Sequence, residues 1–170
     1  MTVFNLNNVK LRTGEQFRES VDVQLEPLVL GGQEYVPVPD EVPSVLTITK
    51  ATSGNVYTLA YTVHLHGPCF RCLRDSTIEL KIHATEYQAN NPDGDEELES
   101  PYIADDLLDL SSWARDALAL ELPEKILHSP DCAGLCPVCG KDLNEEPHTH
   151  EEETADPRWD ALEALRDRLG

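Results

Sequence analysis

Cysteines and histidines near the end of the chain have the residue types and the spacing of a metal site. Cys132, Cys136 and Cys139 precede His148 and His150, so five suitable ligands fall within nineteen positions. Thiolates and imidazoles at this density suit a tetrahedral Zn²⁺ ion. The alternative interpretation is that the thiols are unliganded and the histidines are solvated. We expect a zinc site in this segment.

The sequence Cys-Pro-Val-Cys-Gly at residues 136–140 is the most specific part of this pattern. Two cysteines separated by two residues can hold one ion, because the turn between them aims backbone N–H groups at the sulfurs. Gly140 can adopt the positive φ that closes such a turn. The pattern predicts a zinc knuckle that contains Cys136 and Cys139.

A second pair of cysteines, Cys69 and Cys72, has the same spacing in a different setting. Arg71 and Arg74 would lower the pKa of the neighbouring thiols, as a redox dithiol requires. Thioredoxin-type pairs, however, lie between a strand and the N-terminus of a helix, whereas this pair lies between two predicted strands. The other interpretations are a four-thiolate zinc ribbon that joins both cysteine pairs, and buried unreactive thiols.

No other arrangement of residues points to a catalytic site. The sequence has no Gly-rich phosphate loop, no His-Glu-x-x-His motif and no serine elbow. His64, His66 and His83 fall on or beside predicted strands, and we interpret them as polar residues of a solvent-facing side. No pair among the 32 Asp and Glu residues can be singled out as an acid and a base.

The length and composition are those of a globular protein with a real core. The 170 residues can form one medium domain or a domain with an appendage, and 40% of them are hydrophobic. We expect no signal peptide and no membrane span, because no run of eighteen apolar residues occurs. Cytoplasmic localisation is the expectation. Five cysteines in this setting favour reduced, metal-bound thiols over a disulfide framework.

The negative charge is concentrated in the second half of the chain. Residues 1–90 carry seven Lys and Arg against ten Asp and Glu, whereas residues 91–170 carry six against twenty-two. The net charges are therefore −3 and −16, which sum to the −19 of the whole chain. Such a surface repels phosphate backbones and attracts basic partners. The alternative is that the acidity only keeps the protein soluble.

Alternating apolar and polar residues predict antiparallel β-structure in the first half. Residues 56–65 and 77–85 alternate clearly, and we expect them to form a hairpin whose turn contains the first cysteine pair. Residues 45–49 predict another strand. Prolines at positions 37, 39 and 43 predict an extended loop over residues 31–43, and not a central strand.

Helical patterns occur only in the second half. A helix is predicted over residues 112–121, capped by Asp109 or Ser111. Another is predicted after Asp156, with Pro157 at its first position. We therefore predict an α+β fold, in which an N-terminal antiparallel β-sheet or partial barrel is followed by a helix, a zinc-knuckle-like segment and a C-terminal helix. The predicted parts are a β-rich domain at 1–89, an acidic linker or loop at 90–104, a helical segment packing on the β domain at 105–127, the zinc-knuckle-like segment at 128–150 and the C-terminal helix at 151–170.

The order of these motifs resembles that of the YceD family, the large ribosomal RNA subunit accumulation proteins of bacteria and plastids. The resemblance extends from about residue 11 onward and rests on CFRCL at 69–73, LP at 122–123, DCAGLCPVCGKDLN at 131–144 and DPRWDAL at 156–162. It implies a non-enzymatic role in 23S rRNA accumulation and in the biogenesis of the large ribosomal subunit.

The chain departs from the family pattern at three histidines. Many relatives carry Cys where this chain has His128, and a Cys-x-Cys where it has His148 and His150. Cys and His are exchangeable as zinc ligands, so the departures support ligation at these positions. They leave six candidates for about four coordination places: Cys132, Cys136, Cys139, His150, His148 and His128. Some relatives lack this cluster but keep the first cysteine pair, which implies that the metal is structural.

The resemblance and the charge together predict how the protein acts. The zinc knuckle would attach an acidic segment to the β domain, and that surface would bind a basic ribosomal protein or a pre-large-subunit particle. The segment with Cys69 and Cys72 would add a binding surface, where Arg71, Arg74 and Lys81 could touch rRNA locally. We expect no membrane and no small-molecule substrate. The alternatives are a general acidic zinc-binding adaptor and a zinc- or thiol-dependent enzyme.

Overall fold

The structure is a computed structural model that describes residues 1–91 and 98–150. The chain divides into two compact units, Met1–Pro130 and Asp131–Gly170. Every named strand and helix of the described residues belongs to the first unit. The predicted C-terminal helix and the middle of the predicted acidic linker lie outside the described residues.

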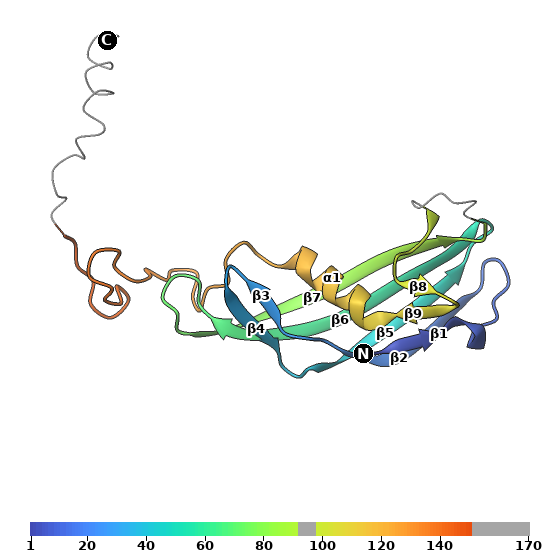
Figure 1. The fold of residues 1–170 in the computed structure, drawn as a ribbon, viewed down its shortest axis with the longest axis horizontal. Coiled ribbons are helices and arrows are strands. Elements are labelled where there is room, and N and C mark those ends of the chain that lie inside the picture. The colour runs from blue at the N-terminus through green and yellow to red at the C-terminus, as the bar shows by residue number, and fades with distance from the viewer. Residues whose placement is uncertain (92–97, 151–170) are drawn as a thin grey trace, which may run out of the picture. The chain divides into compact units, whose positions relative to one another are not determined.

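The first unit is mostly antiparallel β-sheet (Figure 1). In chain order, its described elements are β1 (Val3–Asn5), the 3₁₀ helix η1 (Leu6–Asn8), β2 (Gln16–Gln24), β3 (Leu28–Leu30), β4 (Gln33–Pro37), β5 (Glu41–Lys50), β6 (Gly54–Pro68), β7 (Asp75–Ala89), β8 (Ile103–Ala104), β9 (Leu107–Asp109) and α1 (Leu110–Glu121). This composition confirms the predicted antiparallel sheet followed by a helix.

The larger sheet is organised around β6. One edge of β6 pairs with β7 along its whole length. The other edge pairs first with β5, through residues 55–61, and then with β4, through residues 65–66. β2 lies outside β5 and β3 lies outside β4, and all of these pairings are antiparallel. A smaller sheet has the order β1-β9-β8.

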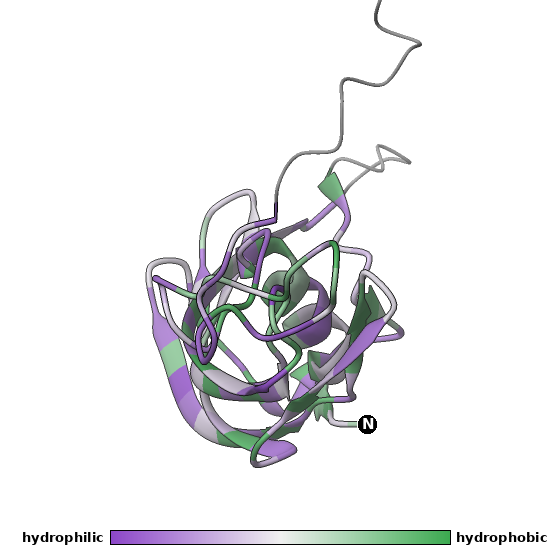
Figure 2. Cartoon of the chain, turned by 90° about the vertical axis from the view of Figure 1, so that its left-hand side faces the viewer, coloured by the Kyte–Doolittle hydropathy of each residue, from purple (hydrophilic) through white to green (hydrophobic). Residues whose placement is uncertain are grey.

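The alternation of β6 explains its position in the sheet. Its buried side carries large apolar residues such as Leu59, Val63 and Leu65, while His64 and His66 are exposed on the other side. Figure 2 shows the same alternation of hydrophobic and hydrophilic residues along the strands. Because successive side chains of a strand point to opposite faces, this pattern fixes which face meets the core.

The predicted hairpin is confirmed, with both strands longer than expected. β6 and β7 pair from Gly54 and Ala89 at one end to Pro68 and Asp75 at the other. The first cysteine pair lies in the turn between them, as the sequence predicts. The hairpin therefore carries both thiols to one end of the larger sheet.

The prediction of a loop over residues 31–43 is wrong. Within that range, β4 pairs with β3 and β6, and β5 already begins at Glu41. Pro43 pairs with Asp22 of β2, whereas pairing of β5 with β6 starts only at Ser44. Proline is tolerated there because one edge of the strand has no partner at that point.

Helix α1 covers the buried face of the sheet and closes the core. It packs on β7, β2 and β1. Its N-cap is Asp109, as predicted, whose carboxylate accepts a hydrogen bond from the N–H of Ser112 at 3.0 Å. Trp113 is 2% exposed, and the hydroxyl of Tyr61 donates to the Ala114 carbonyl. No helix among the described residues is long and apolar enough to cross a membrane.

The described part of the second unit, residues 131–150, is held by local hydrogen bonds. An isolated bridge joins Leu135 to Asp142, and the N–H of Leu143 donates to the Gly134 carbonyl at 2.9 Å. The side chain of Asn144 accepts from the N–H of Ala133 at 2.8 Å. So short a segment buries little apolar surface, so it depends on such bonds and on any bound metal.

Candidate metal centres

The turn between β6 and β7, residues 69–74, is the first of two turns that hold cysteine pairs; we call it the hairpin turn. The N–H of Cys69 donates to the Arg74 carbonyl at 2.7 Å, and the N–H of Leu73 donates back to the Cys69 carbonyl at 2.9 Å. Leu73 has a φ of 61°, in the left-handed region. Cys69 and Cys72 are both buried. The turn thus places two thiols side by side within the protein.

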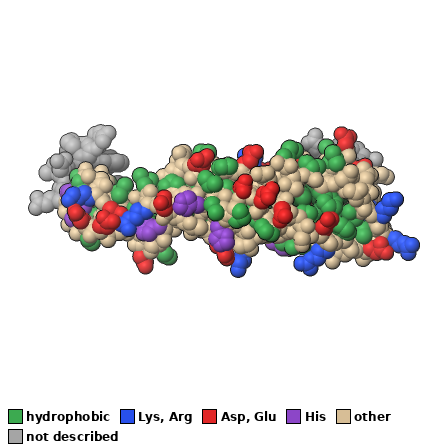
Figure 3. Space-filling model, turned by 90° about the horizontal axis from the view of Figure 1, so that it is seen from below, with side chains coloured by type: hydrophobic (Ala, Val, Ile, Leu, Met, Phe, Trp, Pro, Cys, Tyr) green, Lys and Arg blue, Asp and Glu red, His purple; other side chains and the backbone are tan. Residues whose placement is uncertain are grey.

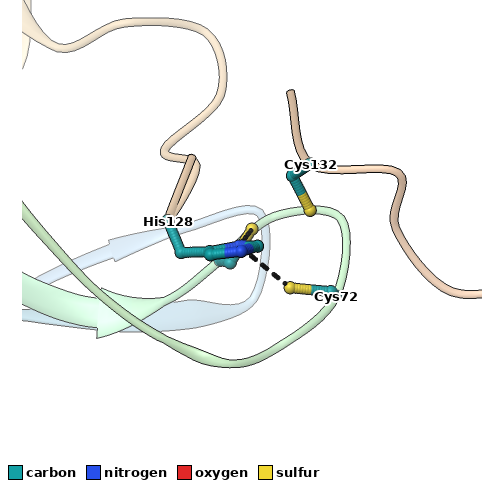
Figure 4. A group of neighbouring side chains, drawn as sticks. Cys72, His128 and Cys132 are labelled. Atoms are coloured by element: carbon teal, nitrogen blue, oxygen red, sulfur yellow. Dashed lines mark hydrogen bonds between the residues drawn. The ribbon is translucent and has the colours of Figure 1, made fainter. Parts of the chain in front are cut away.

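A histidine from the segment that follows α1 completes this group. The N–H of Phe70 donates to the Ile126 carbonyl at 2.8 Å, which attaches that segment to the hairpin turn. The Nδ1 atom of His128 lies 3.2 Å from Cys72 Sγ (Figure 4) and 3.5 Å from Cys69 Sγ. We call these three residues, Cys69, Cys72 and His128, the hairpin cluster.

The spacing in the hairpin cluster suits a shared ion. Its three ligand atoms all lie within 4.8 Å of one another. In tetrahedral zinc sites, Zn–S bonds of about 2.3 Å and Zn–N bonds of about 2.0 Å put neighbouring donors roughly 3.5 to 3.8 Å apart. The hairpin cluster could therefore bind a metal such as zinc with small adjustments of side chains.

The electrostatics of the hairpin cluster favour a thiolate. Burial raises the pKa of Cys69, because it disfavours the charged form. Hydrogen bonds from the side chain and backbone of His128 and from the N–H groups of Cys72 and Arg71 outweigh burial, and they lower the pKa to about 6. The thiolate is the form that ligates metals.

The second turn, residues 136–141, has the same kind of closure; we call it the C-terminal turn. The N–H of Cys136 donates to the Lys141 carbonyl at 2.8 Å, and the N–H of Gly140 donates to the Cys136 carbonyl at 2.8 Å. Gly140 has a φ of 73°, as the sequence predicts. Cys136 is buried and Cys139 is exposed.

Two histidines complete the cluster at the C-terminal turn. The Nε2 atom of His148 lies 3.1 Å from Cys139 Sγ. Its Nδ1 atom lies 2.6 Å from the Glu146 carbonyl oxygen, and Nδ1–H donates to that oxygen, which leaves Nε2 as the ligating atom. The His150 ring lies edge-on to the His148 ring, 5.0 Å between centroids. The ligand atoms of the C-terminal cluster, Cys136, Cys139, His148 and His150, all lie within 4.8 Å of one another.

The electrostatics of the C-terminal cluster favour a thiolate at Cys136 and, without a metal, the protonated form of His148. Hydrogen bonds from the N–H groups of Cys139 and Val138 lower the pKa of Cys136 to about 6 against the opposing effect of burial. The hydrogen bond to the Glu146 carbonyl raises the pKa of His148, and the Cys136 sulfur adds to that effect. A thiolate and a protonated imidazole thus face each other, and a metal ion bound between them would displace the proton.

The structure distributes the predicted ligands over two groups. Cys136, Cys139, His148 and His150 come together, whereas His128 lies with the first cysteine pair. Cys132 is buried, and the side-chain N–H of Asn144 donates to its sulfur at 3.7 Å. The link between His128 and the hairpin turn has no signal in the sequence, because more than fifty residues separate them in the chain.

The predicted basic and histidine residues lie near the hairpin. Arg71 is exposed, and Arg74 is half-buried and closes the hairpin turn through its carbonyl. Lys81 Nζ lies 3.8 Å from a Glu79 carboxylate oxygen, and His64 lies 3.2 Å from the other oxygen. On the face drawn in Figure 3, basic and acidic side chains are interspersed. These contacts are those of the solvated strand face that the sequence predicts.

The comparisons with known proteins bear on the region that contains both clusters. Residues 57–166 match the family described as "Large ribosomal RNA subunit accumulation protein YceD". An uncharacterized protein of Mycobacterium bovis and one of Mycobacterium tuberculosis are each 37% identical over 123 residues. These matches cover 69% of this chain and 58% of each relative, so the chain spans little more than half of their length.

A further match, to an uncharacterized protein of Mycobacterium leprae, is 38% identical over 61 residues and covers 36% of this chain and 28% of the relative. No solved structure matches the chain. The family match spans well over half of the chain and includes both cysteine pairs and all three candidate histidines. This chain therefore belongs to the YceD family of large ribosomal RNA subunit accumulation proteins.

Proposed function

We propose that this protein is a non-enzymatic factor of the cytoplasm that is needed for 23S rRNA accumulation and for assembly of the large ribosomal subunit. The observation that carries the proposal is the family match over residues 57–166. That range begins inside β6 and contains most of the β6–β7 hairpin, all of α1 and both clusters. The parts of the chain with unusual chemistry are thus the parts that are shared with the family.

The charge of the chain supports a basic partner. Residues 91–170 carry a net charge of −16, which would repel bare rRNA over most of that surface. We propose that this acidic half binds a basic ribosomal protein or a pre-large-subunit particle. Contact with rRNA, where it occurs, would be local and would use Arg71, Arg74 and Lys81 near the hairpin.

Zinc in the C-terminal cluster would be structural in this account. The cluster offers two cysteines and two histidines, which fill the four positions of a tetrahedral ion. Catalytic zinc, by contrast, keeps one position for water or substrate. The second unit would gain a fixed shape from the ion, and so present its acidic side chains in a constant arrangement.

The test of this function is a sucrose-gradient profile of cells depleted of the protein, with 23S and 16S rRNA measured in the same samples. We expect a selective loss of 23S rRNA and of free large subunits. Complementation with an Arg71→Glu/Arg74→Glu variant should fail, while an Arg12→Glu/Arg18→Glu variant with the same change of charge should restore the profile. An unchanged ratio of 23S to 16S rRNA would contradict the proposal.

A general acidic adaptor is the second candidate, and the charge of −19 favours it. Such a protein would retain many basic proteins at low salt and release them together as the salt concentration rises. The proposed factor should instead retain large-subunit components selectively at high salt. Pull-downs from a lysate at two salt concentrations separate the two candidates.

A further inference from the structure

The hairpin turn and the C-terminal turn have the same backbone hydrogen bonds. In each, the N–H of the first cysteine donates to the carbonyl of the fifth residue after it, at 2.7 Å from Cys69 and 2.8 Å from Cys136. In each, the fourth residue after that cysteine donates back to the cysteine carbonyl, at 2.9 Å from Leu73 and 2.8 Å from Gly140. The two turns are therefore equivalent in conformation, although they share little sequence beyond the cysteines.

The equivalence extends to the groups that face the sulfurs. The Cys69 sulfur accepts hydrogen bonds from the N–H groups of Arg71 and Cys72, the second and third residues after it. The Cys136 sulfur accepts from Val138 and Cys139, which occupy the same two positions. Backbone N–H groups aimed at a thiolate in this way offset its negative charge and leave its lone pairs for an ion.

Leu73 has a positive φ, which is unusual for a leucine. Leu73 occupies the position of Gly140 and has nearly the same φ, 61° against 73°. A leucine adopts this region only at a cost, since its Cβ is crowded there. Its side chain is more than half exposed, so packing does not hold it in place. The conformation therefore follows from the closure of the turn around the two thiols.

His128 supplies a third ligand close to both sulfurs of the hairpin turn. Its Nδ1 atom lies 3.2 Å and 3.5 Å from the two sulfurs of the hairpin turn. Cys69 is fully buried and Cys72 is 5% exposed, so the two sulfurs and the ring nitrogen meet in a site that is shielded from water. A zinc ion between these three donors would use all of them.

The fourth ligand follows from the count of donors. The C-terminal cluster already contains four donors, and Cys132 is the one cysteine of the five that belongs to neither cysteine pair. Cys132 follows His128 by four residues (both are labelled in Figure 4), and four residues of extended chain reach about 14 Å at most. An ion held by His128 is therefore within the range of this thiol.

We propose that the hairpin turn is a second zinc knuckle, which holds a Zn²⁺ ion of its own through Cys69, Cys72, His128 and Cys132. The protein then binds two zinc ions, one with three thiolates and one imidazole, the other with two of each. The first ion ties the end of the β6–β7 hairpin to the chain that leaves α1. This inference rests on the geometry of the two turns and is independent of the proposed role in rRNA accumulation.

The test is the zinc content of the purified full-length protein, measured by plasma mass spectrometry against protein concentration. We expect two zinc ions per chain in the wild type. Cys72→Ser and Cys139→Ser should each leave one ion, and the double variant should leave none. Each single variant controls for the folding of the other, because the remaining ion reports that the untouched site is intact.

The assignment of Cys132 needs a separate comparison. In the Cys139→Ser background, only the ion of the hairpin cluster remains, and adding Cys132→Ser should remove it in the presence of a competing chelator. In the Cys72→Ser background, the same change should leave the remaining ion in place. The opposite pattern would overturn the assignment of Cys132.

Two results would overturn the second site itself. One is a wild-type protein with a single ion that either cysteine variant abolishes, because that pattern means one site shared by both cysteine pairs. The other is a Cys72→Ser variant that still holds as many ions as the wild type.

Discussion

The hairpin turn and the C-terminal turn have the same backbone hydrogen bonds but lie in different structural surroundings. The hairpin turn closes a long strand pair whose inner side carries the core residues Leu59, Val63 and Leu65. The described part of the second unit has no named strand or helix, and an isolated bridge and local hydrogen bonds surround its turn. The hairpin turn is therefore supported by the strand pair that it closes, whereas the C-terminal turn depends on its ligands.

The two clusters also differ in chemistry and exposure. Both thiols of the hairpin turn are buried, whereas Cys139 of the C-terminal turn is exposed. Thiolates are the softer ligands and carry charge, so a site with three of them should hold zinc more tightly than one with two. We therefore expect a chelator to empty the C-terminal cluster before the hairpin cluster.

Removal of zinc should produce the largest difference between the two units. Structural zinc contributes on the order of 10 kcal/mol to the folding of small metal-binding segments. Treatment with a strong chelator should therefore expose the amides of residues 131–150 to hydrogen exchange, while β6 and β7 keep their protection. Equal loss of protection in both units would contradict the claim that only the second unit depends on its metal for its structure.

Gly67 offers the reverse change, in which the first unit is weakened and the second is untouched. A Cβ at this position would collide with the Tyr35 ring and would lie 2.9 Å from the Glu34 carbonyl oxygen. The ring cannot move aside easily, since it is buried and its hydroxyl donates to the Pro68 carbonyl at 2.9 Å.

We expect Gly67→Ala to lower the free energy of unfolding of the first unit by about 3 kcal/mol. Chemical denaturation followed by tryptophan fluorescence measures this loss, with Thr62→Ala on the exposed face of the same strand as the control. The C-terminal cluster should keep its ion in the folded variant. A loss no greater than that of the control would show that the hairpin end is not rigidly packed.

An exchange of residue types between the two turns tests their equivalence. Leu73→Gly should stabilise the first unit by up to about 1 kcal/mol, because glycine adopts positive φ without crowding. Gly140→Ala should weaken zinc binding at the C-terminal cluster by about 1 kcal/mol, roughly fivefold. No atom lies within 4 Å of a Cβ built at Gly140, so the cost is conformational.

The readouts for this exchange are the denaturation midpoint for Leu73→Gly and a zinc competition titration for Gly140→Ala. The titration is done in the Cys72→Ser background, so that only one site is filled. A destabilising Leu73→Gly would mean that the leucine side chain is needed, and that the turns are not equivalent.

The smallest of the predicted effects is that of alkaline pH, which should lower the free energy of unfolding of the first unit alone. Burial and the nearby Asp116 carboxylate raise the pKa of Tyr102 to about 12, and burial raises that of Tyr61 still further. A tyrosine that holds its proton more tightly when folded contributes stability below its unfolded pKa of about 10 and loses it as pH rises through the folded value.

The free energy of unfolding of the first unit should therefore fall between pH 9 and pH 11, since only the start of these titrations is reached there. All five tyrosines belong to the first unit, so metal binding by the C-terminal cluster should not follow the same curve. Tyr102→Phe should flatten the dependence. A slope that is unchanged in this variant would assign the effect to other groups.

The sequence predicted the elements whose signals are local. Alternation identified the β6–β7 hairpin, and Asp109 was one of two predicted caps for α1. Prolines concealed β4 and the start of β5, because the sequence does not show that Pro43 stands where one edge of the strand is unpaired. Which edge of β5 lacks a partner at Pro43 depends on how the strands pair in the folded sheet.

The sites were harder to predict than the elements, because they depend on tertiary structure. The C-terminal turn carries its own signal in Gly140. The hairpin turn lacks a glycine at the equivalent position, so nothing in Leu73 indicates positive φ. His128 reaches Cys69 and Cys72 only because the chain after α1 returns to the hairpin, where the Ile126 carbonyl accepts from Phe70. That return is set by packing and not by spacing.

X-ray absorption at the zinc edge of the full-length protein tests the two-knuckle account most directly. Five cysteines and three histidines shared by two ions predict an average of 2.5 sulfur and 1.5 nitrogen neighbours per zinc. Sulfur distances should be near 2.3 Å, with no bound water. A first shell of four sulfurs around a single ion per chain, or one that contains oxygen, would contradict the account.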